Sequence, residues 1–172
     1  MKVFISHTTS DDVVARKVYN RLTKVHEIDC YIDDIDIELA KNRGKSSITP
    51  LLVKRLRECD TLLAVVTENT KNSWWVPFEI GTAREIPMII SSFTNLSEPS
   101  IYSFQNVLPE YLLEWPRLRT DEDIDAFAVA YKKRNLISES FGLESNTSSN
   151  NPLQNTRDFE SSVMKSLGQR RY

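Results

Sequence analysis

Residues 73–84 read SWWVPFEIGTAR, and they follow the apolar run TLLAVVT at residues 61–67. The apolar run predicts a buried strand. Ser73 is a natural N-cap, and Pro77 is tolerated in a first helical turn because the N–H that proline lacks would go unpaired there. The sequence therefore predicts a strand followed by a helix that begins within one or two residues of Ser73.

Trp75 and Glu79 are four residues apart, so both side chains lie on one face of that helix. In an open parallel sheet, ligands bind beyond the carboxyl ends of the strands, where the following helices begin. An isolated helix acid is more often solvated, and tryptophans more often belong to a core. The crowding of Trp74, Trp75 and Phe78 around one acid at this junction favours a functional role for Glu79.

The alternation of strand and helix continues on both sides of this stretch. Apolar runs predict strands at 2–6, 29–33, 61–67, 87–91 and 111–115, the last closed by Pro116; helical patterns cover 12–25, 48–58, 73–85, 120–136 and 157–167. This alternation predicts an α/β fold in which a central parallel sheet of about five strands carries helices on both faces.

A change of composition near residue 138 divides the chain. Residues 1–137 would form one α/β domain, and residues 138–172 a polar linker and a C-terminal helical tail. The stretch SNTSSNNPLQNT at 145–156 has almost no apolar residues, which is typical of a mobile linker. Phe159, Val163 and Leu167 recur at fourfold spacing, so the tail helix could pack on the domain, contact another subunit or fray.

Composition and charge narrow the class of protein. The 172 residues are 40% hydrophobic and 27% charged, with a net charge of -2, which gives no electrostatic reason to expect nucleic acid or a membrane as partner. No apolar run approaches a membrane span and nothing resembles a signal peptide, so we expect a cytoplasmic protein. Cys30 and Cys59 look like core thiols, and neither a disulfide framework nor a zinc site is supported.

Polar side chains follow the first three predicted strands. They are Ser6, His7 and Thr8 after the first, Asp33 and Asp34 after the second, and Ser73, Trp75 and Glu79 after the third. Each alone has an ordinary structural explanation, as a loop histidine, a turn-forming aspartate or a helix cap. Because the carboxyl ends of parallel strands meet at one edge, we expect these side chains to converge on one crevice.

Taken together, these segments resemble a TIR domain (Toll/interleukin-1 receptor type). KVFISH at 2–7 looks like the family's first box, YID at 31–33 like the second strand leading into the BB loop, and SWWVPFEIG at 73–81 like the segment with the catalytic glutamate. Trp75 and Glu79 match the W-x-x-x-E spacing of the NAD-cleaving branch. The resemblance covers about residues 1 to 136 and implies a flavodoxin-like TIR fold; nothing in it explains the tail.

The resemblance implies an NAD⁺ glycohydrolase or ADP-ribosyl cyclase. Glu79 would be the catalytic residue, holding the ribose hydroxyls and facing the positive charge that develops as nicotinamide leaves. The substrate-binding residues would be Ser6, His7, Thr8, Asp33, Ser73 and Trp75. NAD⁺ would be the substrate, with no cofactor and no metal.

One departure concerns the diphosphate of NAD⁺. Some TIR NADases carry basic residues just after the first strand, where this chain has Thr8 and Thr9. Diphosphate contacts would then come from backbone N–H groups, from Arg16, or from Lys41, Arg43 and Lys45 in the BB loop.

A short chain of this kind resembles stand-alone bacterial TIR proteins, as in Thoeris antiphage defence, where an ADP-ribose-derived signal reaches a separate effector. The alternative within the family is a non-catalytic adaptor that self-associates through TIR–TIR contacts. A phosphoacceptor receiver domain would require an aspartate after the third strand, where this chain has Thr67 and Glu68. A nucleoside deoxyribosyltransferase, which also places a glutamate at a ribose, is a further alternative.

Overall fold

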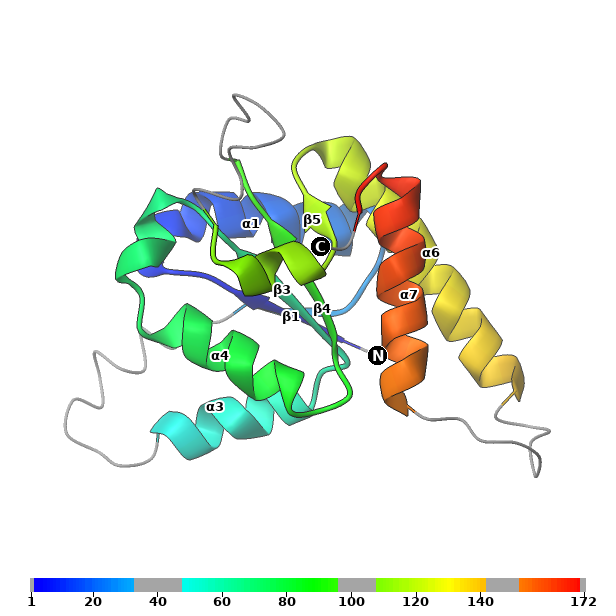
Figure 1. Cartoon of the computed structure of the whole chain (residues 1–172), viewed down its shortest axis with the longest axis horizontal. Helices are drawn as coiled ribbons and strands as arrows, with labels where there is room; N and C mark the ends of the chain where they lie inside the picture. The colour runs from blue at the N-terminus through cyan, green and yellow to red at the C-terminus, as the bar shows by residue number, and fades with distance from the viewer. Residues whose placement is uncertain (1, 33–47, 96–107, 142–151, 171–172) are drawn as a thin grey trace.

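The computed structural model describes residues 2–32, 48–95, 108–141 and 152–170, which are built around a five-stranded parallel sheet (Figure 1). The strands are β1 (Val3–Ser6), β2 (Cys30–Ile32), β3 (Thr61–Val65), β4 (Ile89–Phe93) and β5 (Arg117–Leu118). Their order is β2-β1-β3-β4-β5, and every pairing is parallel. This is the flavodoxin-like order, so the predicted fold is confirmed.

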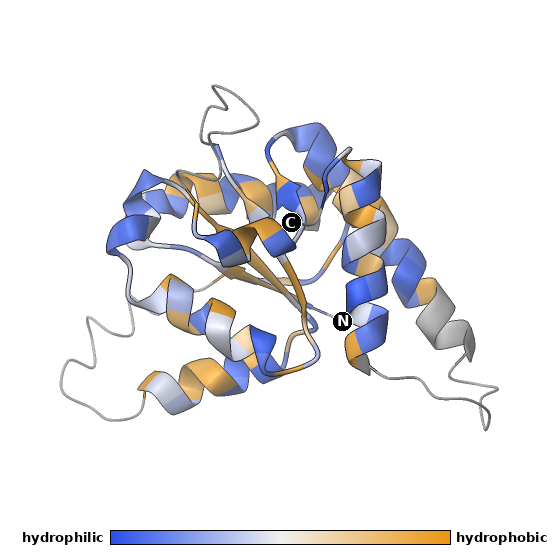
Figure 2. Cartoon of the chain, viewed as in Figure 1, coloured by the Kyte–Doolittle hydropathy of each residue, from blue (hydrophilic) through white to orange (hydrophobic). Residues whose placement is uncertain are grey.

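Helices cover both faces of the sheet. On one face lie α3 (Ile48–Arg57), α4 (Trp75–Arg84) and the 3-10 helix η4 (Glu110–Glu114). On the other lie α1 (Asp12–Asn20), the π-helical turn η2 (Arg21–Val25), α6 (Asp121–Phe141) and α7 (Pro152–Ser166). Figure 2 shows the central strands as a hydrophobic layer between helices that carry hydrophilic residues, as expected for a parallel sheet covered on both faces.

The fifth strand lies later in the chain than the sequence predicts. Residues 110–114 form η4, whose Leu112 and Leu113 are buried against the face that carries α3 and α4. The apolar run therefore reflects a packed helical turn, and the predicted strand at 111–115 was wrong. Pairing begins after the proline, where Ser92 N–H donates to the Pro116 carbonyl at 2.9 Å. β4 likewise ends at Phe93, two residues beyond the prediction.

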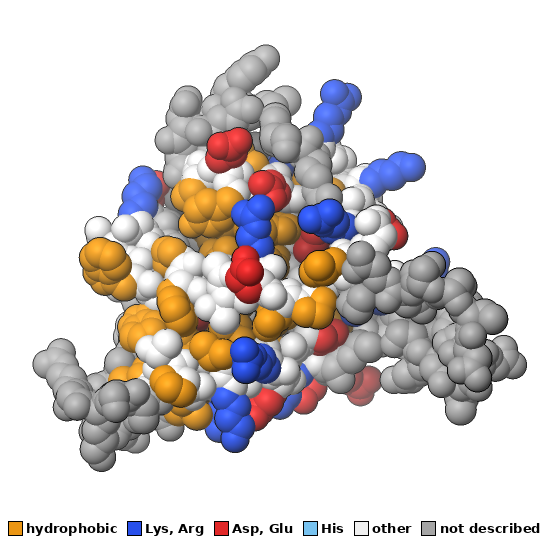
Figure 3. Space-filling view, turned by 60° about the horizontal axis from the view of Figure 1, so that its bottom comes forward, with side chains coloured by type: hydrophobic (Ala, Val, Ile, Leu, Met, Phe, Trp, Pro, Cys, Tyr) orange, Lys and Arg blue, Asp and Glu red, His pale blue; other side chains and the backbone are white. Residues whose placement is uncertain are grey.

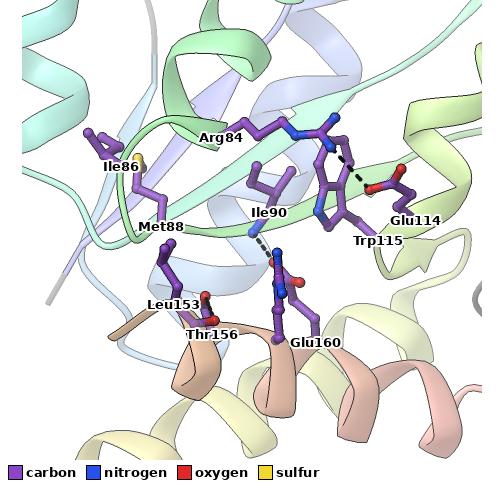
Figure 4. Close-up of a pocket in the computed structure, with 10 residues that line it drawn as sticks. Arg84, Ile86, Met88, Ile90, Glu114, Trp115, Leu153, Thr156 and Glu160 are labelled. Atoms are coloured by element: carbon purple, nitrogen blue, oxygen red, sulfur yellow. Dashed lines mark hydrogen bonds and ion pairs between the residues drawn. The ribbon is translucent and has the colours of Figure 1, made fainter. Parts of the chain in front are cut away.

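Side chains at the end of the chain close the open edge of β4 and β5. Because β5 pairs only with Ser92 and Phe93, the Ile90 N–H has no strand carbonyl on that side and donates to Glu160 Oε1 of α7 at 3.0 Å (Figure 4). Beyond α7, the Gln169 side-chain amide accepts from Arg117 N–H at 3.0 Å and donates to the Arg117 carbonyl. Two side chains thus occupy positions that the backbone of a further strand would fill.

The tail helix packs back on the domain, which is one of the three possibilities that its sequence left open. Phe159 and Val163 belong to the core cluster on the α1 and α6 face of the sheet, and α6 and α7 lie side by side in Figure 1. α7 begins at Pro152, so residues 152–156 of the predicted linker are helical. Residues 142–151 lie outside the described residues.

Candidate active site

The crevice of this sheet lies between the carboxyl ends of β1 and β3. After β1 the chain enters η1 (Thr9–Asp11) and then α1, which packs on one face of the sheet. After β3 it enters η3 (Glu68–Asn72) and then α4, which packs on the opposite face. Two neighbouring strands whose helices diverge in this way leave a crevice at their carboxyl ends, where ligands bind in open α/β sheets.

Glu79 lies in the second turn of α4, and its exposed fraction is 1%. Val76, Ile80 and Ala83 of the same helix are buried in the core that α4 forms with the sheet. Glu79 therefore borders an apolar layer instead of bulk solvent. Electrostatic interactions of a carboxylate are stronger in such surroundings than in water.

Ser73 fixes the start of the helix that carries Glu79. The Ser73 hydroxyl accepts a hydrogen bond from Val76 N–H at 3.2 Å, which satisfies one of the free N–H groups of the first turn. The helix begins at Trp75, within two residues of Ser73, as predicted. A role of Ser73 in binding substrate stays a prediction.

The aromatic side chains around Glu79 do not all face the same way. Trp75 is half-buried, packs against the core and meets the Phe78 ring edge-to-face, with 5.9 Å between ring centroids. Trp74, in contrast, is 90% exposed. The prediction that three aromatics crowd the acid was wrong for Trp74, because it precedes the first helical turn and its side chain points into solvent.

Three predicted residues lie at the carboxyl end of β1, where Ser6 ends the strand and His7 and Thr8 follow it. The Ser6 side chain is buried, and its hydroxyl makes no hydrogen bond within the described residues. The His7 side chain is 4% exposed, with Nε2 3.7 Å from Asp12 Oδ1. Thr8 is half-buried and donates its hydroxyl to Asp11 at 3.1 Å. Asp33, the remaining predicted residue, lies outside the described residues.

Among the side chains predicted to contact the diphosphate, Arg16 is the one that lies within the described residues. Its Nε donates to Asp12 Oδ2 at 2.8 Å, and this hydrogen bond lowers the pKa of the Asp12 carboxyl. Asp12 thus stays ionised beside His7 at neutral pH. Arg16 already has an anionic partner, while Lys41, Arg43 and Lys45 lie outside the described residues.

A buried aspartate links the two loops of the crevice, and the sequence analysis did not single it out. Asp11 is 3% exposed and accepts from Thr67 Oγ1 and Asn69 Nδ2, each at 2.7 Å. Thr67 and Asn69 follow β3, whereas Asp11 follows β1. In the sequence Asp11 reads as one of two acids near a helix start, a pattern typical of a cap.

Glu79 does not line either of two cavities that lie near the sheet within the described residues. One of about 160 Å³ lies beside the first turn of α4 and is lined mainly by apolar side chains, including Pro77 and Tyr111. The other, of about 250 Å³, lies between the start of β4 and α7 (Figure 4), at the opposite end of the sheet. The candidate site is therefore defined by the strand ends and not by either of these cavities.

The described parts of the chain show neither a metal site nor a membrane-spanning helix. No cluster of histidine, cysteine or acidic side chains that could hold a metal ion is found in the described residues, which are 2–32, 48–95, 108–141 and 152–170. Within the same ranges, no helix combines the length and the apolar character needed to cross a membrane. On the face turned forward in Figure 3, acidic and basic side chains are interspersed.

Comparisons with known proteins agree with this architecture. A family described as "TIR domain" matches residues 3–128. The chain is 33% identical over 86 residues to a putative cyclic ADP-D-ribose synthase TIR2 from Cytobacillus dafuensis, covering 49% of this chain and 22% of that protein. It is 28% identical over 82 residues to a probable 3' cyclic ADP-D-ribose synthase ThsB' from Bacillus cereus (strain MSX-D12), covering 46% and 41%.

The matched segments thus span less than half of these curated relatives. Among solved structures, a 2-desoxiribosyltransferase from Leishmania mexicana is similar with a TM-score of 0.44 at 16% identity, over 60% of this chain and 71% of that one.

Proposed function

The chain belongs to the TIR domain family, and on that premise we propose that it cleaves the bond between nicotinamide and ribose in NAD⁺. The observation that carries the proposal is the burial of Glu79, at 1% exposure, on the helix that borders the crevice between β1 and β3. Two curated relatives are named as cyclic ADP-D-ribose synthases, which supports the same reaction class.

The chemistry requires a fixed negative charge more than an acid or a base. When the glycosidic C–N bond breaks, its electron pair leaves with nicotinamide, which becomes a neutral molecule. Positive oxocarbenium character remains on the ribose carbon, and a preorganised carboxylate in a water-poor site stabilises it. Glu79 would face this carbon and hold the ribose hydroxyls.

The remaining predicted residues would orient the substrate. Half-buried Trp75 would provide an apolar wall for nicotinamide or ribose. The rest of the NAD⁺ molecule would be positioned by the other predicted residues, which are Ser6, His7, Thr8, Asp33 and Ser73. The ribose carbon then accepts a water oxygen, which releases a proton and gives ADP-ribose, or a nucleophilic atom of the same molecule, which gives a cyclic isomer. Such a product would act as a signal for a separate effector in bacterial antiphage defence.

A comparison of two helix acids tests the proposal. Purified wild-type protein, Glu79→Gln and Glu85→Gln are incubated with NAD⁺, and released nicotinamide is measured by chromatography, including at high protein concentration and with a crowding agent. Glu85 is exposed at the end of α4, so it controls for the same chemical change on the same helix. We expect Glu79→Gln to lose about 100-fold or more in rate and Glu85→Gln to match wild type.

The alternative is a non-catalytic adaptor that self-associates through TIR–TIR contacts. It is favoured by the exposure of Trp74 (90%) and Phe78 (38%), since large exposed apolar side chains often mark interaction surfaces. If wild-type protein releases no nicotinamide under any of these conditions, or if Glu79→Gln is as fast as wild type, the enzymatic proposal is refuted.

A further inference from the structure

Asp11 accepts three side-chain hydrogen bonds, and two of them come from the loop after β3. Its Oδ2 accepts from the Thr8 hydroxyl at 3.1 Å and from the Thr67 hydroxyl at 2.7 Å. Its Oδ1 accepts from Asn69 Nδ2 at 2.7 Å. All three partners donate, and the two carboxyl oxygens of Asp11 accept. Asp11 is 3% exposed, and its bonds to Thr67 and Asn69 hold the loop after β1 against the loop after β3.

The connection continues from Thr67 to the helix that carries Glu79. The Thr67 hydroxyl accepts from Asn69 N–H at 3.0 Å, and Thr67 N–H donates to Thr70 Oγ1 at 2.9 Å, so Thr67 caps η3. Ser73 N–H donates to the Thr70 carbonyl at 3.0 Å, and the Ser73 hydroxyl caps α4. An unbroken series of hydrogen bonds therefore runs from Asp11 to the first turn of α4.

We propose that Asp11 is a positioning residue: it sets the spacing between the loop at 6–8 and α4, and hence between the substrate-binding side chains and Glu79. This inference rests on the function proposed above. Asp11 would touch neither the substrate nor the reacting atoms. It acts through the two loops, whose relative placement decides whether the ribose carbon meets the carboxylate in a productive geometry.

The first test removes all three hydrogen bonds at once. For Asp11→Ala, we expect kcat/KM for NAD⁺ to fall about 100-fold, the loss typical of a misplacement of about 1 Å, measured where circular dichroism shows the variant to be folded. Asp158→Ala is the matched control, because the Asp158 carboxylate also accepts from a side-chain amide, that of Gln154 at 2.8 Å, on the surface of α7. A purely structural Asp11 would leave kcat/KM of the folded protein unchanged, and that result overturns the inference.

The second test exchanges the two polar groups. Asn69→Asp places a second carboxylate opposite that of Asp11, where the Asn69 amide nitrogen now lies 2.7 Å from Asp11 Oδ1. We expect this variant to have a lower kcat/KM, because the two like charges repel each other. Adding Asp11→Asn should restore kcat/KM to within about threefold of wild type, because the introduced amide can donate to the new carboxylate while its carbonyl oxygen accepts both hydroxyls. If the double variant is no more active than Asn69→Asp alone, the geometric role of Asp11 is wrong.

A measurement without turnover separates this inference from the proposed function. Hydrogen exchange of the backbone amides at 73–80 should be faster in Asp11→Ala than in Asp158→Ala, because the connection from Asp11 to α4 is broken. If wild-type protein is inactive on NAD⁺, the proposed function fails. The link between Asp11 and α4 is then tested by hydrogen exchange alone. Unchanged exchange at 73–80 overturns it.

Discussion

Truncating Phe159 tests whether α7 is part of the hydrophobic core. Phe159 is 8% exposed, and its ring meets the Phe127 ring edge-to-face with 6.0 Å between centroids. The Arg134 guanidinium carbon lies over the Phe159 ring, 5.8 Å from its centroid. The family match ends at residue 128, so this helix lies outside it. We expect Phe159→Ala to lower the free energy of unfolding of the whole domain.

The magnitude follows from burial and ring geometry. Burying an aromatic side chain removes about 150–250 Å² from water, and at about 25 cal/mol per Å² this contributes roughly 4–6 kcal/mol. Core substitutions of phenylalanine by alanine cost about 3–5 kcal/mol. We therefore expect a loss of about 4 kcal/mol, which in a protein of this size lowers Tm by about 10 °C.

Urea unfolding followed by circular dichroism measures the difference. Leu153→Ala is the control on the same helix, because Leu153 is 48% exposed and should cost no more than about 1 kcal/mol. If Phe159→Ala loses less than Leu153→Ala, then α7 is not packed into the core, and the assignment of this helix to the folded domain is refuted.

Two further predictions concern the sheet edge and the thiols. Gln169→Ala leaves the N–H and the carbonyl of Arg117 without their side-chain partner, and we expect a loss of about 1–3 kcal/mol in urea unfolding; an unchanged midpoint would contradict it. Burial raises the pKa of Cys59 to about 11 and that of Cys30 to about 12. Between pH 9 and these values the unfolded thiols ionise while the folded ones stay protonated, so stability falls as pH rises. The variant with both cysteines changed to alanine should show a smaller alkaline loss of stability than wild type; an equal loss would refute this.

The fold was predictable where a strand is mostly apolar or a helix start carries a capping residue. β1, β3 and β4 are buried along their whole length, so each appears as an apolar run, and Ser73 marks the start of α4 as it caps it. β5 was not predictable. It has two residues, begins with Arg117, and is defined by hydrogen bonds to its neighbour in the sheet. The apolar run before it packs as a helical turn, which the sequence does not distinguish from a strand.

The candidate site was predictable only as far as strand ends define it. Ser6 and His7 lie at the carboxyl end of β1, and Glu79 lies on the helix that follows β3, as the predicted order of strands and helices implies. Their joint role in binding substrate stays a prediction. The role of Asp11 escaped detection, because its partners Thr67 and Asn69 are 56 and 58 residues away along the chain. Spacing within a segment predicts which helix face a residue occupies, but not which distant donor its side chain meets.

The two side chains that close the sheet edge bear on where this protein can be shortened. A fragment that ends at residue 128, where the family match stops, would lack Glu160 and Gln169 and leave peptide groups of β4 and β5 bare. Bare strand edges are templates for pairing with strands of other molecules, which is a route to aggregation. A shortened version of this domain should therefore extend through Gln169, so that both side chains that cover the sheet edge are kept.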